Sequence, residues 1–261
     1  MIRTKLGMLG LCAIVFGVMA MSASAAQGAT LTWLVLNAPK TVSTTIELQG
    51  EGVNLLAELT GEKESSHIAL LTELSGLRVS VVCNTFDLVG VHLGAHDTLS
   101  HGKVKFEGCN AYSLTALQVE MKEPLGTDLG CLVKSPGANK GVVETNKGKG
   151  LLVLHNNNTE VLTRIEPAAL AGETADFATL RFEECALTEV NPVRGVLYIK
   201  DDRGEATTHK ERHLIVEGPL TALHLGNHTT MKLELTKILG AAWVELKGAH
   251  DGLEWSANDT P

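Results

Sequence analysis

Aromatic and basic residues are both scarce in this chain of 261 residues. Aromatic side chains make up 4% of it, and 22 Lys and Arg stand against 30 Asp and Glu. The formal net charge is −8, and no basic run of the kind that binds nucleic acid occurs. Few aromatics also means few platforms on which bases or sugars could stack. We therefore expect no nucleic-acid partner.

The sequence also lacks the short motifs that mark common catalytic sites. It has no Gly-x-Ser-x-Gly, no His-Glu-x-x-His and no glycine loop for phosphate or dinucleotide. Ser75, Ser100 and Ser135 stand beside turn or polar residues, as turn serines do. The adjacent acids Glu183 and Glu184 would point to opposite faces of a strand, so they do not converge as glycosidase carboxylates would. The sequence predicts no catalytic residue and no cofactor.

A long apolar run occurs at the start of the chain and nowhere else. Residues 6–21 are uncharged, follow two basic residues and precede Ala23-Ser24-Ala25. A basic segment, an apolar segment and a small-x-small site are the parts of a secretory signal peptide, and the run is short for a bilayer crossing. We expect residues 1–26 to be that signal, with the mature chain beginning at Ala26 or Gln27. The rest should be exported and contain no transmembrane segment.

Four cysteines remain after the signal, and no two of them form a Cys-x-x-Cys pair. An even number in an oxidising compartment favours two disulfides over a metal site. We prefer a Cys109–Cys131 bridge, across a hairpin whose outgoing strand is Thr115 to Met121, with Cys83 bonded to Cys185 at the ends of two apolar strands. The alternative pairing, Cys83 with Cys109 and Cys131 with Cys185, keeps each link more local.

Helical periodicity is rare, and alternation with period two dominates residues 27–261. The alternation predicts that Val104, Phe106, Leu180 and Phe182 face inward, while Lys105, Glu107, Arg181 and Glu183 face solvent. Turn signals occur at Gly50-Glu51-Gly52, Ser75-Gly76, Ser135-Pro136-Gly137, Lys147-Gly148, Asn191-Pro192 and Gly226-Asn227. Short strands with frequent turns predict one all-β, disulfide-stapled domain, an antiparallel sandwich or a barrel-like sheet.

Two short segments of the chain recur. The segment 104–109 is similar to 180–185, and the segment 94–97 recurs as 248–251. One interpretation is an internal duplication; the other, which we prefer, is that alternating strands resemble one another by chance. No long linker separates two halves, so we expect a single domain, with an internal boundary near residues 135–140 as the alternative.

Histidine is the most conspicuous excess among residues that could carry chemistry. Ten are present, and pairs at i, i+4 include His92 with His96 and His224 with His228. Two such positions on one strand lie about 13 Å apart, too far to chelate one ion without a turn between them. We therefore prefer surface or turn histidines to a metal site, and these four are the candidate ligands if a metal is bound.

The cysteines stand among turn glycines and strand phenylalanines in a characteristic order. The segments concerned are Val104–Cys109, Cys131, Ser135–Ala138, Gly141–Asn146 and Gly248–Trp255. This order resembles that of a group of exported bacterial proteins of unknown function, of the kind found in soil actinobacteria. The shared motifs are structural, so the resemblance implies an exported disulfide-bonded domain and no catalytic residue.

Two classes of function fit these observations. The preferred one is a secreted or cell-envelope β-domain with a binding or structural role toward an unidentified ligand or partner. The alternative is a secreted hydrolase, with or without a metal ion, whose site is assembled from scattered histidines and acids. The tryptophans Trp243 and Trp255 form a close pair in the sequence, and we expect them to pack in the core or at a sheet edge.

Overall fold

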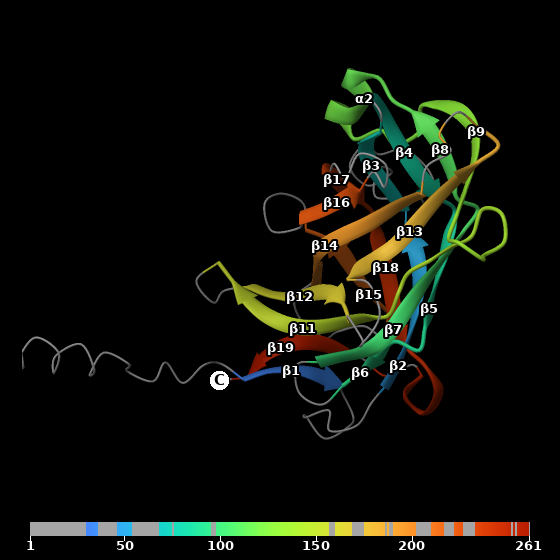
Figure 1. Cartoon of the computed structure of the whole chain (residues 1–261). Helices are drawn as coiled ribbons and strands as arrows, with labels where there is room; N and C mark the ends of the chain where they lie inside the picture. Colours follow the sequence, from blue (N-terminus) through green and yellow to red (C-terminus); the bar gives the residue numbers. More distant parts are fainter. Residues whose placement is uncertain are drawn as a thin grey trace, which may run out of the picture. The chain divides into compact units, whose positions relative to one another are not determined.

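β-Strands make up almost all of the described part of the chain (Figure 1). The computed structural model describes residues 30–35, 46–53, 68–74, 76–94, 98–156, 160–168, 175–185, 187, 190–201, 210–216, 222–226, 233–251, 253 and 255–260. Residues Leu31–Asp259 form one compact unit. The predicted signal peptide, residues 1–26, lies outside the described residues.

The elements follow one another closely along the chain. They are β1 (Thr30–Val35), β2 (Ile46–Val53), β3 (Ile68–Leu74), β4 (Leu77–Cys83), β5 (Thr85–Val89), β6 (His92–Leu93), β7 (Thr98–Glu107), β8 (Asn110–Ser113), α2 (Ala116–Met121), β9 (Thr127–Lys134), β10 (Val143–Glu144), β11 (Gly148–His155), β12 (Glu160–Pro167), β13 (Asp176–Glu183), β14 (Val190–Asp201), β15 (Lys210–Ile215), β16 (Ala222–Gly226), β17 (Leu233–Leu239), β18 (Ala241–Leu246), a 3₁₀ turn (Gly248–His250) and β19 (Trp255–Thr260). Among the described residues, no helix is long and apolar enough to cross a membrane.

The strands from β2 to β18 pair in two series, antiparallel throughout. The first series runs β3–β4–β8–β9–β13–β14–β16–β17, and β17 also pairs with β3. The second series runs β2–β6–β7–β11–β12–β14–β15–β18, and β18 also pairs with β2. Each series curves enough for its last strand to pair with its first. The prediction of an all-β, antiparallel fold with barrel-like curvature is confirmed.

Two long strands, β14 and β7, connect different sets of pairs. The first half of β14 pairs with β13 and β16, and its second half pairs with β12 and β15. Gly195 lies at the change of partners with φ of 130°, a value that residues with a side chain rarely adopt. The first half of β7 pairs with β6 and β11, and its second half with β5 and β10. Both strands therefore hold the two series together.

The described buried side chains form three clusters, and the two largest lie one in each series. The first cluster lies in the first series, around the cysteines and the buried residues Val79, Val133 and Phe182. The second cluster contains Trp33 and Trp255, whose ring centroids are 5.9 Å apart. These tryptophans come from β1 and β19, which pair as a separate two-stranded sheet. Trp255 therefore packs in the core, as expected, with its ring against that of Trp33, and the side chain of Trp243 lies outside the described set.

The predicted inward and outward faces of two strands are confirmed. Leu180 and Phe182 are buried in the first cluster, while Arg181 is exposed. On β7, Lys105 forms an ion pair with Glu107 on the outer face. Their neighbours Val104 and Phe106 turn inward, but they are only half-buried, and they line a cavity.

The preferred disulfide pairing is wrong, and the alternative pairing is found. Cys83 bonds to Cys109 with 4.0 Å between their Cα atoms, and Cys131 bonds to Cys185 with 5.1 Å. The register of β4 and β8 explains why Cys83 bonds to Cys109. Val82 of β4 stands opposite Asn110 of β8, so the next residue on one side, Cys83, meets the preceding residue on the other, Cys109. On β9, Cys131 stands opposite Ala111 and not opposite Cys109.

The predicted outgoing strand from Thr115 to Met121 is also wrong, because these residues form helix α2 and its cap. The Thr115 hydroxyl accepts a hydrogen bond from the backbone N–H of Gln118, and the Gln118 side chain accepts one from the Thr115 backbone N–H. This capping box satisfies two amide groups at the start of the helix. Lys122 ends it in the left-handed conformation, with φ of 58°.

Two predicted turns lie inside strands. Gly50–Gly52 belongs to β2, and Asn191–Pro192 belongs to β14. Gly148 begins β11, so the signal at Lys147-Gly148 marks the start of a strand. The turn at Gly76, with φ of 81°, is found where it was predicted, and Ser135–Gly137 also forms a turn.

The recurrence of 104–109 at 180–185 has a local structural counterpart. In each copy a strand ends at the Glu, the next residue takes a left-handed conformation and a bonded cysteine follows. The left-handed residues are Gly108, with φ of 65°, and Glu184, with φ of 64°. The likeness between the segments therefore reflects one way of ending a strand at a disulfide. Whether it arose by duplication stays a hypothesis.

Candidate functional site

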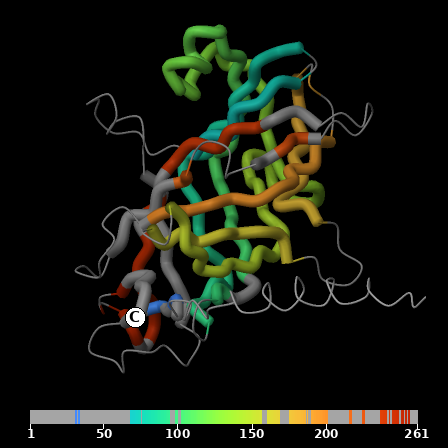
Figure 2. The backbone as a smooth tube through the Cα atoms, turned by 90° about the vertical axis from the view of Figure 1, so that its left-hand side faces the viewer, coloured from blue at the N-terminus to red at the C-terminus, as the bar shows by residue number. Residues whose placement is uncertain are grey.

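An apolar cavity of about 290 Å³ lies inside the compact unit. One wall comes from β5, β7 and β10, and the facing wall comes from β12, β14 and β15. Figure 2 shows the yellow and orange strands of the second wall crossing in front of the green strands of the first. The cavity therefore occupies the space between two crossing parts of the sheet.

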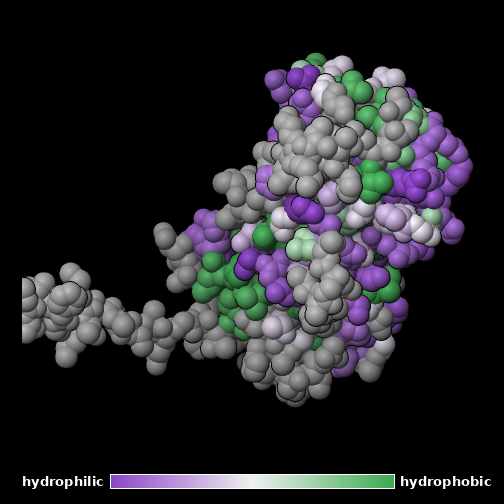
Figure 3. Space-filling model, viewed as in Figure 1, coloured by the Kyte–Doolittle hydropathy of each residue, from purple (hydrophilic) through white to green (hydrophobic). Residues whose placement is uncertain are grey.

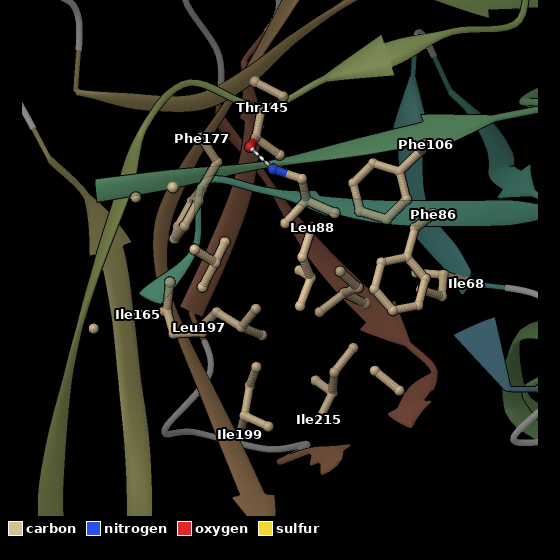
Figure 4. A pocket seen from close by; sticks show the side chains of 18 of the residues that line it. Ile68, Phe86, Leu88, Phe106, Thr145, Ile165, Phe177, Leu197, Ile199 and Ile215 are labelled. Carbon is tan, nitrogen blue, oxygen red and sulfur yellow. Dashed lines mark hydrogen bonds between the residues drawn. The ribbon is translucent and has the colours of Figure 1, made fainter. Parts of the chain in front are cut away.

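The lining is dominated by large apolar side chains. Three of the five phenylalanines of the chain, Phe86, Phe106 and Phe177, line the cavity, together with both paired tryptophans. In Figure 4 the aromatic rings stand along two sides of the space, and aliphatic side chains close the third. The aliphatic residues labelled there are Ile68, Leu88, Ile165, Leu197, Ile199 and Ile215. Among the described lining residues, none carries an ionisable side chain except Cys83, which is bonded.

Strand register explains why the second wall is continuous. On β12, Thr163 stands opposite Ile199 of β14, and Ile165 stands opposite Leu197. Ile199 also stands opposite Ile215 of β15. Residues directly opposite each other project from the same face of a sheet. Five lining residues on three strands are thereby aimed at one space.

The charged side chains of this wall lie on its outer face. Arg164 separates the two lining residues of β12, and Lys149 precedes the lining Gly150 on β11. Both pair with Glu166, at 2.6 Å from Arg164 and 2.9 Å from Lys149. The hydrogen bond from Lys149, with the nearby Arg164 charge, lowers the pKa of the Glu166 carboxyl. On the face drawn in Figure 3, hydrophilic residues cover much of the right side, and hydrophobic residues gather at the lower left. The alternation thus separates charge outside from apolar surface inside.

Three lining side chains carry a hydroxyl or an amide group. The Thr145 hydroxyl accepts a hydrogen bond from the Val104 backbone N–H at 2.8 Å, drawn in Figure 4. The Asn146 amide donates to the Asp176 backbone carbonyl at 2.8 Å. Thr163 is 6% exposed, and its hydroxyl forms no hydrogen bond with any residue that the structure describes. One lining hydroxyl therefore keeps its hydrogen-bonding capacity.

Glycines shape one end of the lining. Gly148 on β11 stands opposite Gly102 on β7. A Cβ atom added to Gly150 would lie 2.6 Å from Leu99 Cδ1, so the absence of a side chain lets Leu99 pack closely there. A Cβ atom at Gly148 would meet nothing nearer than 3.6 Å. Gly148 therefore leaves room that a larger side chain would take.

The predicted candidate metal ligands are not brought together in the described part of the chain. His92 is half-buried on β6, and His224 is half-buried on β16, where its Nδ1 has no hydrogen-bond partner among the described residues. His96 and His228 lie outside the described residues. No group of three or more His, Cys, Asp or Glu side chains in the described ranges could hold a metal ion.

The serines and paired acids singled out in the sequence are in part described. Ser135 is buried, and its hydroxyl bonds both the carbonyl and the N–H of Glu144, which fixes the chain next to the turn. Glu183 pairs with Lys134, and the neighbouring Glu184 pairs with Lys140 on the surface. Each group thus has a structural contact. The side chains of Ser75 and Ser100 lie outside the described set.

The chain has no match among family models, curated proteins or solved structures. The resemblance to exported bacterial proteins of unknown function therefore stays a prediction. The cavity and the residues that line it are therefore the features from which a function can be inferred.

Sequence reasoning placed some of these residues on the inner face but did not find the cavity. Val104 and Phe106 were predicted to face inward as core residues. Period-two alternation identifies an inner face, yet it does not show whether the facing wall fills the space. A usable signal was the series of glycines at inner positions, since Gly148 and Gly150 alternate with Lys149 as apolar residues do elsewhere.

Proposed function

We propose that this protein is an exported binding protein that holds a small apolar molecule inside its β-domain. The observation that carries the proposal is the cavity of about 290 Å³ with an almost wholly apolar lining. Binding pockets for small molecules start at about 300 Å³ and are lined mainly by hydrophobic and aromatic side chains with few polar groups. Engineered apolar cavities of about 150 Å³ stay dry and bind benzene or xenon.

The two disulfides support the export part of the proposal. Bridges persist in oxidising compartments, outside the cell or in its envelope, and are rare in the cytosol. They close loops with separations of 26 and 54 residues around the first buried cluster. That cluster supports strands β7, β13 and β14, which also line the cavity. The bridges would thus keep the binding site preformed outside the cell. The hydrolase alternative gains no supporting observation from the described residues.

Calorimetric titration with propylbenzene, a neutral ligand of nine non-hydrogen atoms, tests the proposal on the disulfide-bonded protein. We expect one molecule to bind per chain. Leu197→Trp should weaken binding at least tenfold, because Leu197 projects into the space (Figure 4). The matched control is Leu151→Trp, since Leu151 is 39% exposed on the outer face of β11. Absence of binding, or equal loss in both variants, would contradict the proposal.

A further inference from the structure

We infer that the bound molecule is neutral and carries one hydrogen-bonding oxygen, which Thr163 recognises. This inference rests on the proposed function and adds a ligand class and a specificity residue to it. The cavity has about twice the volume of engineered apolar cavities that bind benzene, a ligand of six non-hydrogen atoms, so a ligand of about ten non-hydrogen atoms is a suitable size. A small alcohol, ketone or ester of that size has the required chemistry.

The neutral charge follows from the described lining. A buried ion needs an opposite charge or several hydrogen bonds, because leaving water without them costs several kcal/mol. The charges nearest to the second wall, Arg164, Lys149 and Glu166, pair with one another on its outer face. The lining itself offers such an ion no described counter-charge. A carboxylate or an amine would therefore bind poorly there.

The single oxygen follows from the state of the three polar side chains. Thr145 and Asn146 already bond the backbone, at Val104 and Asp176. Thr163 is more than nine-tenths buried, and it stands opposite Ile199, which Figure 4 shows projecting into the cavity. A hydroxyl that faces an apolar cavity gains little from its surroundings, and a ligand oxygen placed beside it would give it a hydrogen bond. Thr163 is thus a lining group that can distinguish an alcohol from a hydrocarbon.

Two ligands with equal numbers of non-hydrogen atoms test the inference, 2-phenylethanol and propylbenzene. We expect Thr163→Val, which keeps the shape and removes the hydroxyl, to weaken 2-phenylethanol binding about fivefold and to leave propylbenzene unchanged. Thr163→Ser should keep the wild-type preference. Thr179→Val is the matched control, because Thr179 alternates with the lining residues Ala178 and Leu180 on β13. Phenylacetate should bind at least tenfold more weakly than 2-phenylethanol.

The outcomes separate this inference from the proposed function. Equal effects of Thr163→Val on both ligands, or no effect on either, would overturn the role of Thr163 while propylbenzene binding upholds the cavity. Phenylacetate binding as tight as that of 2-phenylethanol would overturn the neutral class. If wild-type protein bound neither neutral ligand, the proposed function and the inference would both fail. Far-ultraviolet circular dichroism of each variant shows whether it has folded, and Thr163→Ala, which also removes the hydroxyl, decides the case if Thr163→Val has not.

Discussion

The first buried cluster and the cavity wall are built from the same kind of strand, yet their inner faces end up in different states. In β4, β8 and β9 the inward residues Val79, Ala111 and Val133 are completely buried and pack against the cysteines. In β14 and β15 the inward residues Ile199 and Ile215 are equally apolar but only half-buried, because they border the cavity. An apolar inner face therefore becomes packed core where side chains of the facing strands contact it, and a cavity wall where they do not.

The largest expected effect is a difference in stability loss when a phenylalanine is replaced by alanine in each of the two regions. Phe182→Ala in the first cluster should lower the free energy of unfolding by about 3–5 kcal/mol, because Phe182 is 2% exposed. Phe106→Ala at the cavity wall should cost less than half as much, because its ring already borders empty space. Urea unfolding of both variants measures the difference. Equal losses would show that the cavity is filled by protein in solution.

Removing a disulfide should have the next largest effect on the free energy of unfolding. Chain entropy assigns about 4 kcal/mol to the Cys131–Cys185 bridge and about 3.5 kcal/mol to the Cys83–Cys109 bridge, given separations of 54 and 26 residues. We expect the Cys131→Ala/Cys185→Ala variant to be the less stable of the two double variants. Non-reducing peptide mapping checks the pairing itself. A Cys109–Cys131 peptide would contradict the structure.

The helix cap tests the edge of the first region. Thr115→Ala removes the side-chain acceptor of the capping box and should cost about 1 kcal/mol. Thr115→Ser keeps the acceptor and should cost little, which makes it the control. Urea unfolding again gives the comparison. A loss above about 3 kcal/mol would mean that Thr115 has a role beyond the cap.

The smallest effect concerns the charges outside the cavity wall. The partners of Glu166 lower its pKa, so the ion pairs stabilise the protein above the pKa of an unfolded Glu, about 4.3, and lose that contribution as the pH falls through the folded value. Glu166→Gln should cost about 0.5 kcal/mol at pH 7 and less near pH 3. Thermal unfolding at both pH values measures it. A cost that grew toward low pH would contradict the assigned direction.

Much of the fold could be predicted from the sequence because alternation reports directly on the two faces of a strand. Leu180, Phe182 and Arg181 show this. The disulfide pairing could not, because it depends on which strands become neighbours, and β4 pairs with β8 although β5, β6 and β7 lie between them in the sequence. Helix α2 was missed since its six residues are too few to show a helical period, although its Thr115 and Gln118 capping pair was readable.

The site was less predictable than the fold. The numerous histidines were the candidate ligands in the sequence, whereas the cavity is lined by apolar residues of the kind found in any core, such as Leu197 and Ile165. Thr163, the residue proposed to recognise the ligand oxygen, lies in β12, whose sequence has the same alternation as the other strands. Its significance comes from the long-range pairing of β12 with β14, and a single sequence does not contain that pairing.

Diffraction from crystals pressurised with xenon tests the central claim most directly. Xenon occupies empty apolar cavities without needing a specific hydrogen bond. A cavity between the β7 and β14 walls predicts a strong anomalous peak bordered by Phe106, Leu197 and Ile199. No peak, with those three side chains in contact with one another, would contradict the account.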